Sequence, residues 1–257
     1  MPDVIVLSAL APMHREPDVR SEQVSQMIMG ETATVLERQG DWFHLRRDED
    51  DYPGFTHSGY LSPPDASRAA AWRLRATCRG DQAVVRNGSH PMALPLMARV
   101  AARDGRWDLP DGREVTLLSG AILPFPEILT AAQRVPVVQW AISQFRGTPY
   151  QWGGVTSWGV DCSGLVQTCF AARGVRLPRD ASQQAEKGTA VHLDDVRSGD
   201  LMFFREREDR VTHVAFADGR DTLAHSTLSC GGFIVEPLRE GARAGLLRER
   251  LVAVRRI

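Results

Sequence analysis

The sequence predicts a multidomain protein in which two small all-β barrels, residues 1–65 and 66–125, precede an α+β domain over residues 126–257. Three observations lead to this fold class. Short strand-like segments alternate with turns in the first half, prolines punctuate the connections, and a glycine-rich loop then leads into an apolar helix that begins with a cysteine. With 257 residues, of which 43% are hydrophobic and 25% charged, the chain can bury several small cores.

The first barrel is predicted from short strands at regular spacing, which are typical of small closed sheets. The strand candidates are residues 32–36, 42–45 and 54–56, and residues 63–65 (Pro-Pro-Asp) form a linker behind them. The second barrel is predicted because residues 70–120 repeat this theme.

A weak internal repeat supports two related barrels. Gly40-Asp41-Trp42 and Gly105-Arg106-Trp107 match at a separation of about 65 residues. Residues 94–100 and 109–113 complete the second set of segments. The match is short enough to arise by chance, and that alternative stays open.

Composition limits the function classes and the partners. The formal net charge of −1 provides no overall field that would attract nucleic acid or an anionic membrane surface. The first residues lack the basic region of a secretory signal, and no apolar run is long enough to span a bilayer. The four cysteines, Cys78, Cys162, Cys169 and Cys230, lack the paired spacing of a zinc site and are few for a disulfide scaffold. We therefore expect a cytoplasmic protein without nucleic-acid or membrane partners.

Cys162 is the strongest candidate for a reactive residue. Residues 137–145 are predicted to form a helix, and the loop Pro149-Tyr150-Gln151-Trp152-Gly153-Gly154 leads on to a second helix that begins at Cys162 behind an Asp161 N-cap and ends near Gly174. The helix dipole favours a thiolate at this position, so we expect a lowered thiol pKa. A small buried packing residue is the alternative for a cysteine taken alone.

Two histidines are predicted to lie on one β-hairpin. His213 belongs to the strand candidate 211–216 and His225 to the strand candidate 222–226. They are directly opposite each other only if the hairpin is centred on Gly219. A loop with an odd number of residues would place both imidazoles on one face of the sheet, whereas a two-residue loop would separate them.

With this register, the three residues Cys162, His213 and His225 can form a catalytic triad. His213 would take the thiol proton and later protonate the leaving amine, while His225 accepts a hydrogen bond from the far nitrogen of His213 and fixes its tautomer. Structural histidines are one alternative. A zinc site built from the same three residues is another, although no fourth ligand is apparent.

The chain resembles the NlpC-type papain-like cysteine peptidases of bacterial cell-wall metabolism along essentially its whole length. Four motifs occur in the order and at spacings similar to those of the family: Asp161-Cys162-Ser163-Gly164, the Gly-Asp-Leu-x-Phe-Phe segment at 199–204, Thr212-His213-Val214 and Ala224-His225-Ser226. The resemblance implies an α+β papain-like peptidase domain that needs no cofactor or metal. It assigns Cys162 as nucleophile, His213 as base and His225 as the orienting residue.

The same resemblance implies the surroundings of the triad. Tyr150 matches the family tyrosine near the oxyanion site. The residues expected to line the substrate pocket are Trp152, Asp161, Ser163, Arg179 and Asp180. Ala181 stands where some relatives have serine, which puts one substrate contact in doubt.

The front half resembles the SH3-like barrels of the family branch that cleaves free murein peptides. In that branch the first barrel recognises the free amino group of an N-terminal L-alanine. Glu22 and Tyr52 match the segments involved and are the expected amine-binding pair, with Glu31 as a substitute for Glu22. A carboxylate suits this role because a desolvated ammonium group needs a charged partner.

The expected activity is hydrolysis of the γ-D-glutamyl bond to meso-diaminopimelate or L-Lys in a murein peptide such as L-Ala-γ-D-Glu-meso-diaminopimelate, for cell-wall peptide recycling. Two other functions stay open: a non-catalytic murein-fragment binding protein, and a thioester acyltransferase or amidase on the same scaffold. The preferred diamino acid, the stem length and the oligomeric state are left open by the sequence. Cys78, Cys169 and Cys230 are expected to be packing residues.

Overall fold

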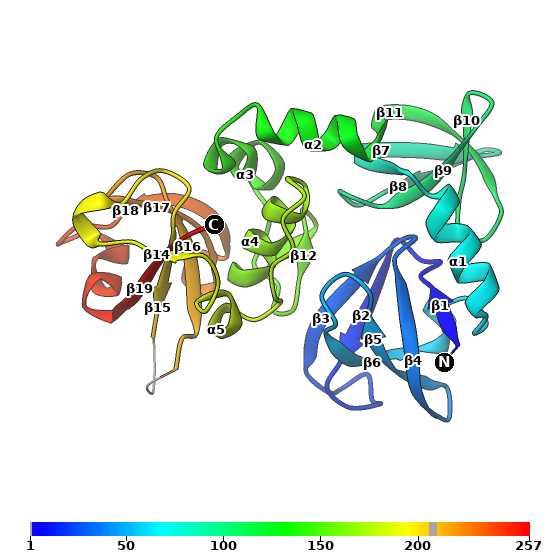
Figure 1. Cartoon of the computed structure of the whole chain (residues 1–257), viewed down its shortest axis with the longest axis horizontal. Helices are drawn as coiled ribbons and strands as arrows, with labels where there is room; N and C mark the ends of the chain where they lie inside the picture. Colours follow the sequence, from blue (N-terminus) through cyan, green and yellow to red (C-terminus); the bar gives the residue numbers. More distant parts are fainter. Residues whose placement is uncertain (1, 206–209) are drawn as a thin grey trace. The chain divides into compact units, whose positions relative to one another are not determined.

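The structure of the protein is a computed structural model that describes residues 2–205 and 210–257. It divides the chain into two compact units, residues 1–129 and 130–257 (Figure 1). No helix among the described residues is long and apolar enough to cross a membrane.

Unit 1 begins with a six-stranded antiparallel sheet in the order β1-β4-β5-β6-β2-β3. Its strands are β1 (Asp3–Ile5), β2 (Leu10–His14), β3 (Gln23–Ile28), β4 (Thr32–Gln39), β5 (Trp42–Arg47) and β6 (Pro53–His57). Apolar side chains from most of these strands, among them Met13, Met27 and Leu45, share one buried core. The three strands predicted in this region are therefore confirmed as β4, β5 and β6.

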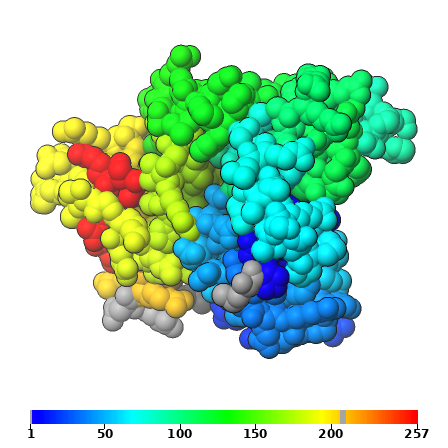
Figure 2. Space-filling view, turned by 45° about the vertical axis from the view of Figure 1, so that its right-hand side comes forward, coloured from blue at the N-terminus to red at the C-terminus, as the bar shows by residue number. Residues whose placement is uncertain are grey.

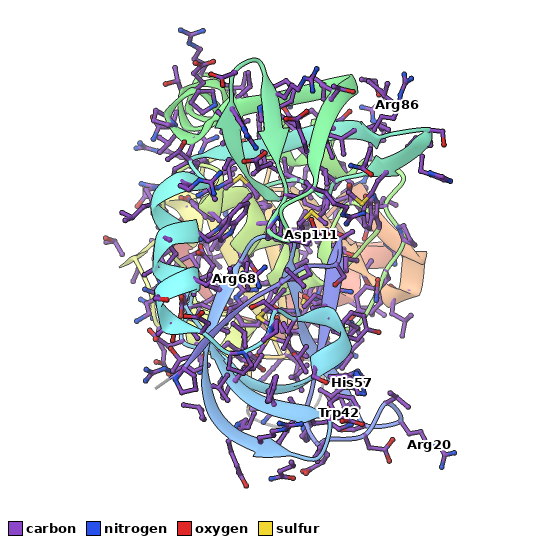
Figure 3. All side chains as sticks on the ribbon, turned by 90° about the vertical axis from the view of Figure 1, so that its right-hand side faces the viewer. Arg20, Trp42, His57, Arg68, Arg86 and Asp111 are labelled. Atoms are coloured by element: carbon purple, nitrogen blue, oxygen red, sulfur yellow. The ribbon has the colours of Figure 1, made fainter. Side chains whose placement is uncertain are left out.

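The surface of this first sheet carries a row of aromatic rings. Trp42 lies between His14 and His57, with ring centroids 5.5 Å and 5.4 Å apart and edge-to-face geometry. Figure 3 shows Trp42 and His57 side by side. These ring contacts join three different strands, β2, β5 and β6.

The second sheet of unit 1 closes on itself. Its strands are β7 (Cys78–Asn87), β8 (His90–Ala93), β9 (Arg99–Arg103), β10 (Arg106–Asp108) and β11 (Glu114–Pro124). The order is β11-β10-β9-β7-β8, and β11 also pairs with β7, which completes a ring of four strands around a separate buried core. The strand expected at residues 94–100 is largely wrong, because the strand begins only at Arg99.

The two Gly-x-Trp motifs occupy equivalent places in the two sheets. Gly40 (φ 60°) and Gly105 (φ 81°) both adopt the left-handed conformation at the turn of an antiparallel hairpin, β4–β5 and β9–β10. Glycine adopts this conformation without the penalty that a Cβ atom brings. The equivalence supports the internal repeat, while the identity of the second sheet as an SH3-like barrel stays a prediction.

Helix α1 (Ala66–Arg75) was not anticipated by the all-β prediction for residues 1–125, and helix α2 (Phe125–Gln133) was not among the helices predicted for residues 126–257. Helix α1 begins behind Asp65, whose side chain accepts hydrogen bonds from the backbone N–H groups of Ser67 and Arg68. Helix α2 follows β11 directly. Helix α1 was missed because the two prolines ahead of it indicated a linker, although an aspartate before an alanine-rich segment is a recognisable helix start.

Unit 2 combines three helices with a six-stranded sheet of order β14-β19-β15-β16-β17-β18. The helices are α3 (Val137–Phe145), α4 (Cys162–Ala171) and α5 (Ala181–Gln184). The strands of the sheet are β14 (Thr189–Ala190), β15 (Leu201–Phe204), β16 (His213–Ala217), β17 (Thr222–Thr227), β18 (Gly232–Pro237) and β19 (Leu251–Arg256). The short hairpin β12 (Val155–Thr156) and β13 (Gly159–Val160) precedes α4. The predicted helix 137–145 is confirmed as α3.

The C-terminal strand β19 lies inside this sheet and also pairs with β14. Figure 2 shows the C-terminal residues, in red, at the surface beside the yellow segment that includes β14. One face of the sheet packs with the 3₁₀ segment η4 (Arg243–Arg250) around Met202, Phe204 and Leu223. On the other face, the Phe216 ring lies 6.0 Å from Phe170 of α4.

Candidate active site

The N-terminus of α4 is held by Asp161. Its Oδ1 atom accepts a hydrogen bond from the backbone N–H of Gly164 at 2.7 Å, which confirms the predicted N-cap, and its Oδ2 atom accepts one from the backbone N–H of Gly153 at 2.9 Å. The loop and the helix approach so closely that a Cβ atom at Gly164 would lie 2.1 Å from the carbonyl oxygen of Gly154. Asp161 therefore ties the glycine-rich loop to the helix that carries Cys162.

A buried arginine completes this support. Arg179, only 2% exposed, donates from Nη2 to Asp161 Oδ2 at 2.5 Å and from Nη1 to both Asp161 Oδ1 at 3.1 Å and Ser163 Oγ at 2.8 Å. Arg179 thus contacts both oxygens of the Asp161 carboxylate, and such bidentate pairs are the stronger form of an arginine–carboxylate interaction. Three residues that the sequence assigned to the substrate pocket thus bond to one another beneath the start of α4.

The Cys162 thiol is buried at the first residue of α4. Burial, and next the negative charge of Asp161, raise the pKa of Cys162 to about 12. The backbone N–H groups of Val214 and Ser163 and the charge of Arg179 act in the opposite direction without offsetting that rise. The expectation of a lowered pKa is therefore wrong for this structure, because desolvation and a neighbouring carboxylate outweigh the helix terminus.

In the hairpin that carries the histidines, each residue of β16 pairs two residues further along β17 than predicted. Phe216 pairs with Ala224 and Ala217 with Leu223, so the hairpin is centred on residue 220 rather than on Gly219. Extended by one residue, this register sets Ala215 opposite His225, and His213 lies two residues away from Ala215 on β16. The backbone N–H of Asp218 donates to the carbonyl of Thr222, so the loop consists of the three residues 219–221. The predicted odd number of loop residues is therefore confirmed, and both imidazoles lie on one face, but the histidines are diagonal neighbours instead of a directly opposed pair.

The two imidazoles are nevertheless in hydrogen-bond contact. His213 Nε2 and His225 Nδ1 lie 2.7 Å apart, and both side chains are buried. Burial lowers the pKa of His213 to about 3. A neutral His213 has one ring nitrogen that can accept a proton, as a general base requires.

Sequence reasoning missed the next residue in this chain of contacts, Glu236 of β18. Its Oε1 atom lies 2.7 Å from His225 Nε2 and also accepts a hydrogen bond from Arg243 Nη2. The carboxylate is buried, at 7% exposure. Only the pairing of β18 with β17 brings Glu236 to the histidine pair, and nothing in the local sequence signals that pairing.

No group of three or more His, Cys, Asp and Glu side chains in the described part of the chain is arranged to hold a metal ion. His225 bonds through its two ring nitrogens to His213 and to Glu236.

The remaining predicted pocket residues of unit 2 lie around the loop before α4 and at α5. Tyr150 is half-buried and its backbone N–H donates to the carbonyl of Gly231 at 2.8 Å. Trp152 is 59% exposed in the glycine-rich loop, and Trp158, which sequence reasoning did not single out, is 41% exposed in the turn between β12 and β13. Asp180 is half-buried at the N-cap position of α5, where its side chain makes no capping hydrogen bond.

The residues expected to bind the substrate amine belong to unit 1. Glu22 forms an ion pair with Arg15 at 2.7 Å and is partly exposed. Tyr52 is half-buried and packs against the first core. The substitute candidate Glu31 is buried, and its Oε2 atom accepts a hydrogen bond from the backbone N–H of Ile28 at 3.0 Å. Glu31 thus has a structural role in the turn between β3 and β4.

Comparison with known proteins agrees with this division of the chain. A model of the NlpC/P60 family matches residues 147–255, and a model of the bacterial dipeptidyl-peptidase SH3 domain matches residues 13–58. The chain is 29% identical to the gamma-D-glutamyl-L-lysine dipeptidyl-peptidase of Bacillus subtilis (strain 168), over 90% of this chain and 80% of that protein.

Two further similarities concern the peptidase half and the fold. The probable endopeptidase NlpC of Escherichia coli (strain K12) is 38% identical over 92 residues, which are 35% of this chain and 60% of that protein. The crystal structure of an NlpC/P60 family protein from Bacillus cereus ATCC 10987 has a TM-score of 0.79 and covers 99% of both chains at 19% identity. At this low sequence identity, the match to the Bacillus cereus structure shows a similar fold only.

Proposed function

Since the chain contains an NlpC/P60 domain and a bacterial dipeptidyl-peptidase SH3 domain, we propose that it is a cysteine peptidase that hydrolyses the γ-D-glutamyl bond to a diamino acid in short murein peptides. One observation carries the proposal. A cysteine at the start of a buried helix accepts a backbone hydrogen bond from Val214, the residue after His213, and His213 is in turn bonded to His225.

In the proposed reaction, His213 takes the Cys162 proton as the sulfur attacks the γ-carbonyl carbon. The new C–S bond forms, the C–N bond to the diamino acid breaks, and His213 returns the proton to the departing amine. Water then cleaves the thioester, which regenerates the thiol and releases L-Ala-γ-D-Glu. The backbone N–H of Cys162 and the Tyr150 side chain stabilise the oxyanion.

Asp161, Ser163 and Arg179 act as positioning residues in this scheme. Their polar atoms bond to each other and to the backbone of the loop and of α4, so they hold the helix start rather than the substrate. The exposed side chain of Trp152 and the half-buried carboxylate of Asp180 are the proposed substrate contacts of unit 2.

Recognition of a free N-terminal L-Ala is proposed for unit 1, with Glu22 and Tyr52 as the residues involved. Glu22 is preferred over Glu31 because the Glu31 carboxylate is buried and already accepts a backbone hydrogen bond. The closed second sheet is proposed to be a second SH3-like barrel, and unit 2 an α+β papain-like domain. Cytoplasmic recycling of released wall peptides is the proposed context.

The test is mass spectrometry of L-Ala-γ-D-Glu-meso-diaminopimelate incubated with the protein, beside its N-acetylated form and its L-Lys analogue. Release of L-Ala-γ-D-Glu from the free-amine peptides alone, abolished by Cys162→Ala, is the expected result. Cleavage of the acetylated peptide at the same rate would remove the amine-recognition part. No cleavage of any peptide would favour a binding protein, and capture of an added amine instead of water would favour an acyltransferase.

A further inference from the structure

We propose that Glu236 is a positioning residue that sets the proton arrangement of the histidine pair, so that His213 presents an unprotonated Nδ1 atom. This inference rests on the proposed peptidase function and extends it by one residue that no sequence motif marks. It follows from the topology of three adjacent strands, from the hydrogen-bond chemistry of carboxylates and imidazoles, and from one arginine.

The sheet register aligns the three side chains. Phe216 pairs with Ala224 across β16 and β17, so Ala215 is the position that this register, extended by one residue, sets opposite His225; across β17 and β18, His225 pairs with Ile234 and Leu223 with Glu236. His213 and Glu236 therefore each lie two residues off the position opposite His225, on the same face of the sheet and on neighbouring strands. The resulting diagonal places His213 Nε2 at 2.7 Å from His225 Nδ1, and His225 Nε2 at 2.7 Å from Glu236 Oε1.

Proton counting along this diagonal determines which nitrogen is free. An ionised carboxylate only accepts hydrogen bonds, so the hydrogen between Glu236 and His225 belongs to His225 Nε2. Neutral His225 then has an unprotonated Nδ1, and the hydrogen of the second contact must belong to His213 Nε2. Neutral His213 is left with its Nδ1 lone pair, which is the base that the Cys162 thiol requires.

Arg243 keeps the carboxylate of Glu236 ionised. Burial raises the pKa of Glu236, but the hydrogen bond from His225 and the charge and hydrogen bond of Arg243 lower it by more, so the carboxylate is ionised at neutral pH. The guanidinium group of Arg243 bonds directly to Glu236, so the buried carboxylate has a cationic partner that is independent of the protonation of His225. A second anchor, from Arg243 Nη1 to Ser229 Oγ at 2.5 Å, holds the guanidinium in position.

The same arrangement serves the reaction step. When His213 accepts the thiol proton it becomes an imidazolium group, and its Nε2 hydrogen remains donated to His225. The Glu236 carboxylate, one ring further, stabilises that positive charge through His225. The reverse arrangement, in which a doubly protonated His225 donates from Nδ1, would place the hydrogen of His213 on its Nδ1 and block proton transfer from the thiol.

The test is ¹⁵N NMR of histidine-labelled full-length protein near pH 7, because protonated and unprotonated ring nitrogens have well-separated shifts. Spectra of His213→Gln and His225→Gln identify the two rings. Unprotonated Nδ1 atoms on both His213 and His225 are expected in the wild-type protein, and Glu236→Ala should change this pattern. A proton on His213 Nδ1, or an unchanged pattern in Glu236→Ala, would overturn the proposal.

Kinetics provide the second measurement. Glu236→Gln keeps the shape of the side chain and removes its charge. We expect kcat to fall roughly tenfold to a hundredfold, which is typical when the hydrogen-bond partner of a functional histidine is changed, with little change in KM. Glu114→Gln, which breaks an exposed ion pair with Arg106 in unit 1, is the control and should leave kcat unchanged. Unchanged kcat in Glu236→Gln would overturn the role. If the wild-type protein cleaves no murein peptide, the proposed function fails, while the NMR measurement still decides the proton arrangement.

Discussion

At the scale of single residues, the main feature of the site is that the proposed nucleophile and the proposed base are both buried. The pKa of Cys162 is raised to about 12 and that of His213 is lowered to about 3, in each case chiefly by desolvation. Both shifts favour the uncharged form. The resting pair is therefore a thiol and a neutral imidazole, and in the proposed reaction the thiolate forms as the proton moves to His213 during attack.

The lowered pKa of His213 makes folding stability depend on pH. In the unfolded chain this side chain takes up a proton near its ordinary pKa of 6.5, whereas in the folded protein it stays neutral down to about pH 3. Between these values the unfolded state binds more protons, so the free energy of unfolding falls as the pH falls. We expect His213→Gln to flatten this part of the curve.

Urea unfolding from about pH 7 to about pH 4 measures this effect. His90→Gln, at an exposed position of β8, is the matched control and should keep the wild-type slope. An equal slope in His213→Gln and the wild-type protein would mean that His213 is protonated in the folded state over this range.

Sequence reasoning at this scale succeeds where a residue acts through its neighbours in the chain and fails where it acts through strand pairing. The Asp161 cap and the start of α4 follow from adjacent residues, and both are confirmed. Glu236 reaches His225 only because β18 pairs with β17 in one particular register. No local pattern encodes that register.

At the scale of elements, α4 depends on a buried ion pair for the placement of its first turn. Asp161 accepts hydrogen bonds from the loop, the helix and Arg179 at once. Removing the arginine leaves a buried carboxylate without its charged partner. Arg179→Ala should therefore lower the free energy of unfolding by about 3 kcal/mol and reduce kcat. Lysine cannot bond to both carboxylate oxygens in the same way, so Arg179→Lys should have a free energy of unfolding and a kcat between those of Arg179→Ala and the wild-type protein.

Urea unfolding and steady-state kinetics of the two variants test this expectation. Arg106→Gln, which removes an exposed arginine in unit 1, is the control and should leave stability unchanged. If Arg179→Ala unfolds like the wild-type protein and raises only KM, Arg179 contacts substrate instead, as the resemblance first implied.

The hairpin of β16 and β17 shows how far element geometry can be predicted from sequence. The parity of the loop decides which face both histidines occupy, and the expected odd loop is present. The centre of the hairpin depends on one further residue in the turn, and Gly219, with φ 76°, starts the turn rather than forming its middle. Imidazole side chains are long enough to bridge the diagonal, so the hydrogen bond forms despite the shift.

At the scale of the whole molecule, the chemistry and the proposed amine recognition belong to different units. Cys162, His213, His225 and Glu236 lie in residues 130–257, and Glu22 and Tyr52 lie in residues 1–129. The sequence anticipated this order of domains because strand-rich segments precede the cysteine helix. It did not anticipate α1, which lies in the segment predicted as the second barrel, or α2, which lies almost wholly in the predicted α+β domain ahead of the first helix expected there.

The proposed assignment of amine recognition to unit 1 leads to a prediction about selectivity for a free N-terminus. Tyr52 packs against the first core, so Tyr52→Phe preserves the packing and removes only the hydroxyl group. If that hydroxyl binds the substrate ammonium group, its loss should lower kcat/KM for L-Ala-γ-D-Glu-meso-diaminopimelate about tenfold, since a hydrogen bond to a charged group contributes roughly 1.5–3 kcal/mol. The N-acetylated peptide has no ammonium group, so Tyr52→Phe should not lower any residual cleavage of that peptide.

The matched control is Tyr60→Phe, which removes a hydroxyl group from a partly exposed tyrosine of the same unit and should affect neither peptide. Mass spectrometry of both peptides with both variants yields the ratio of the two rates. A selective loss in Tyr52→Phe would assign amine recognition to unit 1. Equal losses on the two peptides would mean that Tyr52 acts on the fold or on the general placement of substrate, and selection for a free N-terminus would then have to originate within unit 2, where the half-buried carboxylate of Asp180 is the residue to test next.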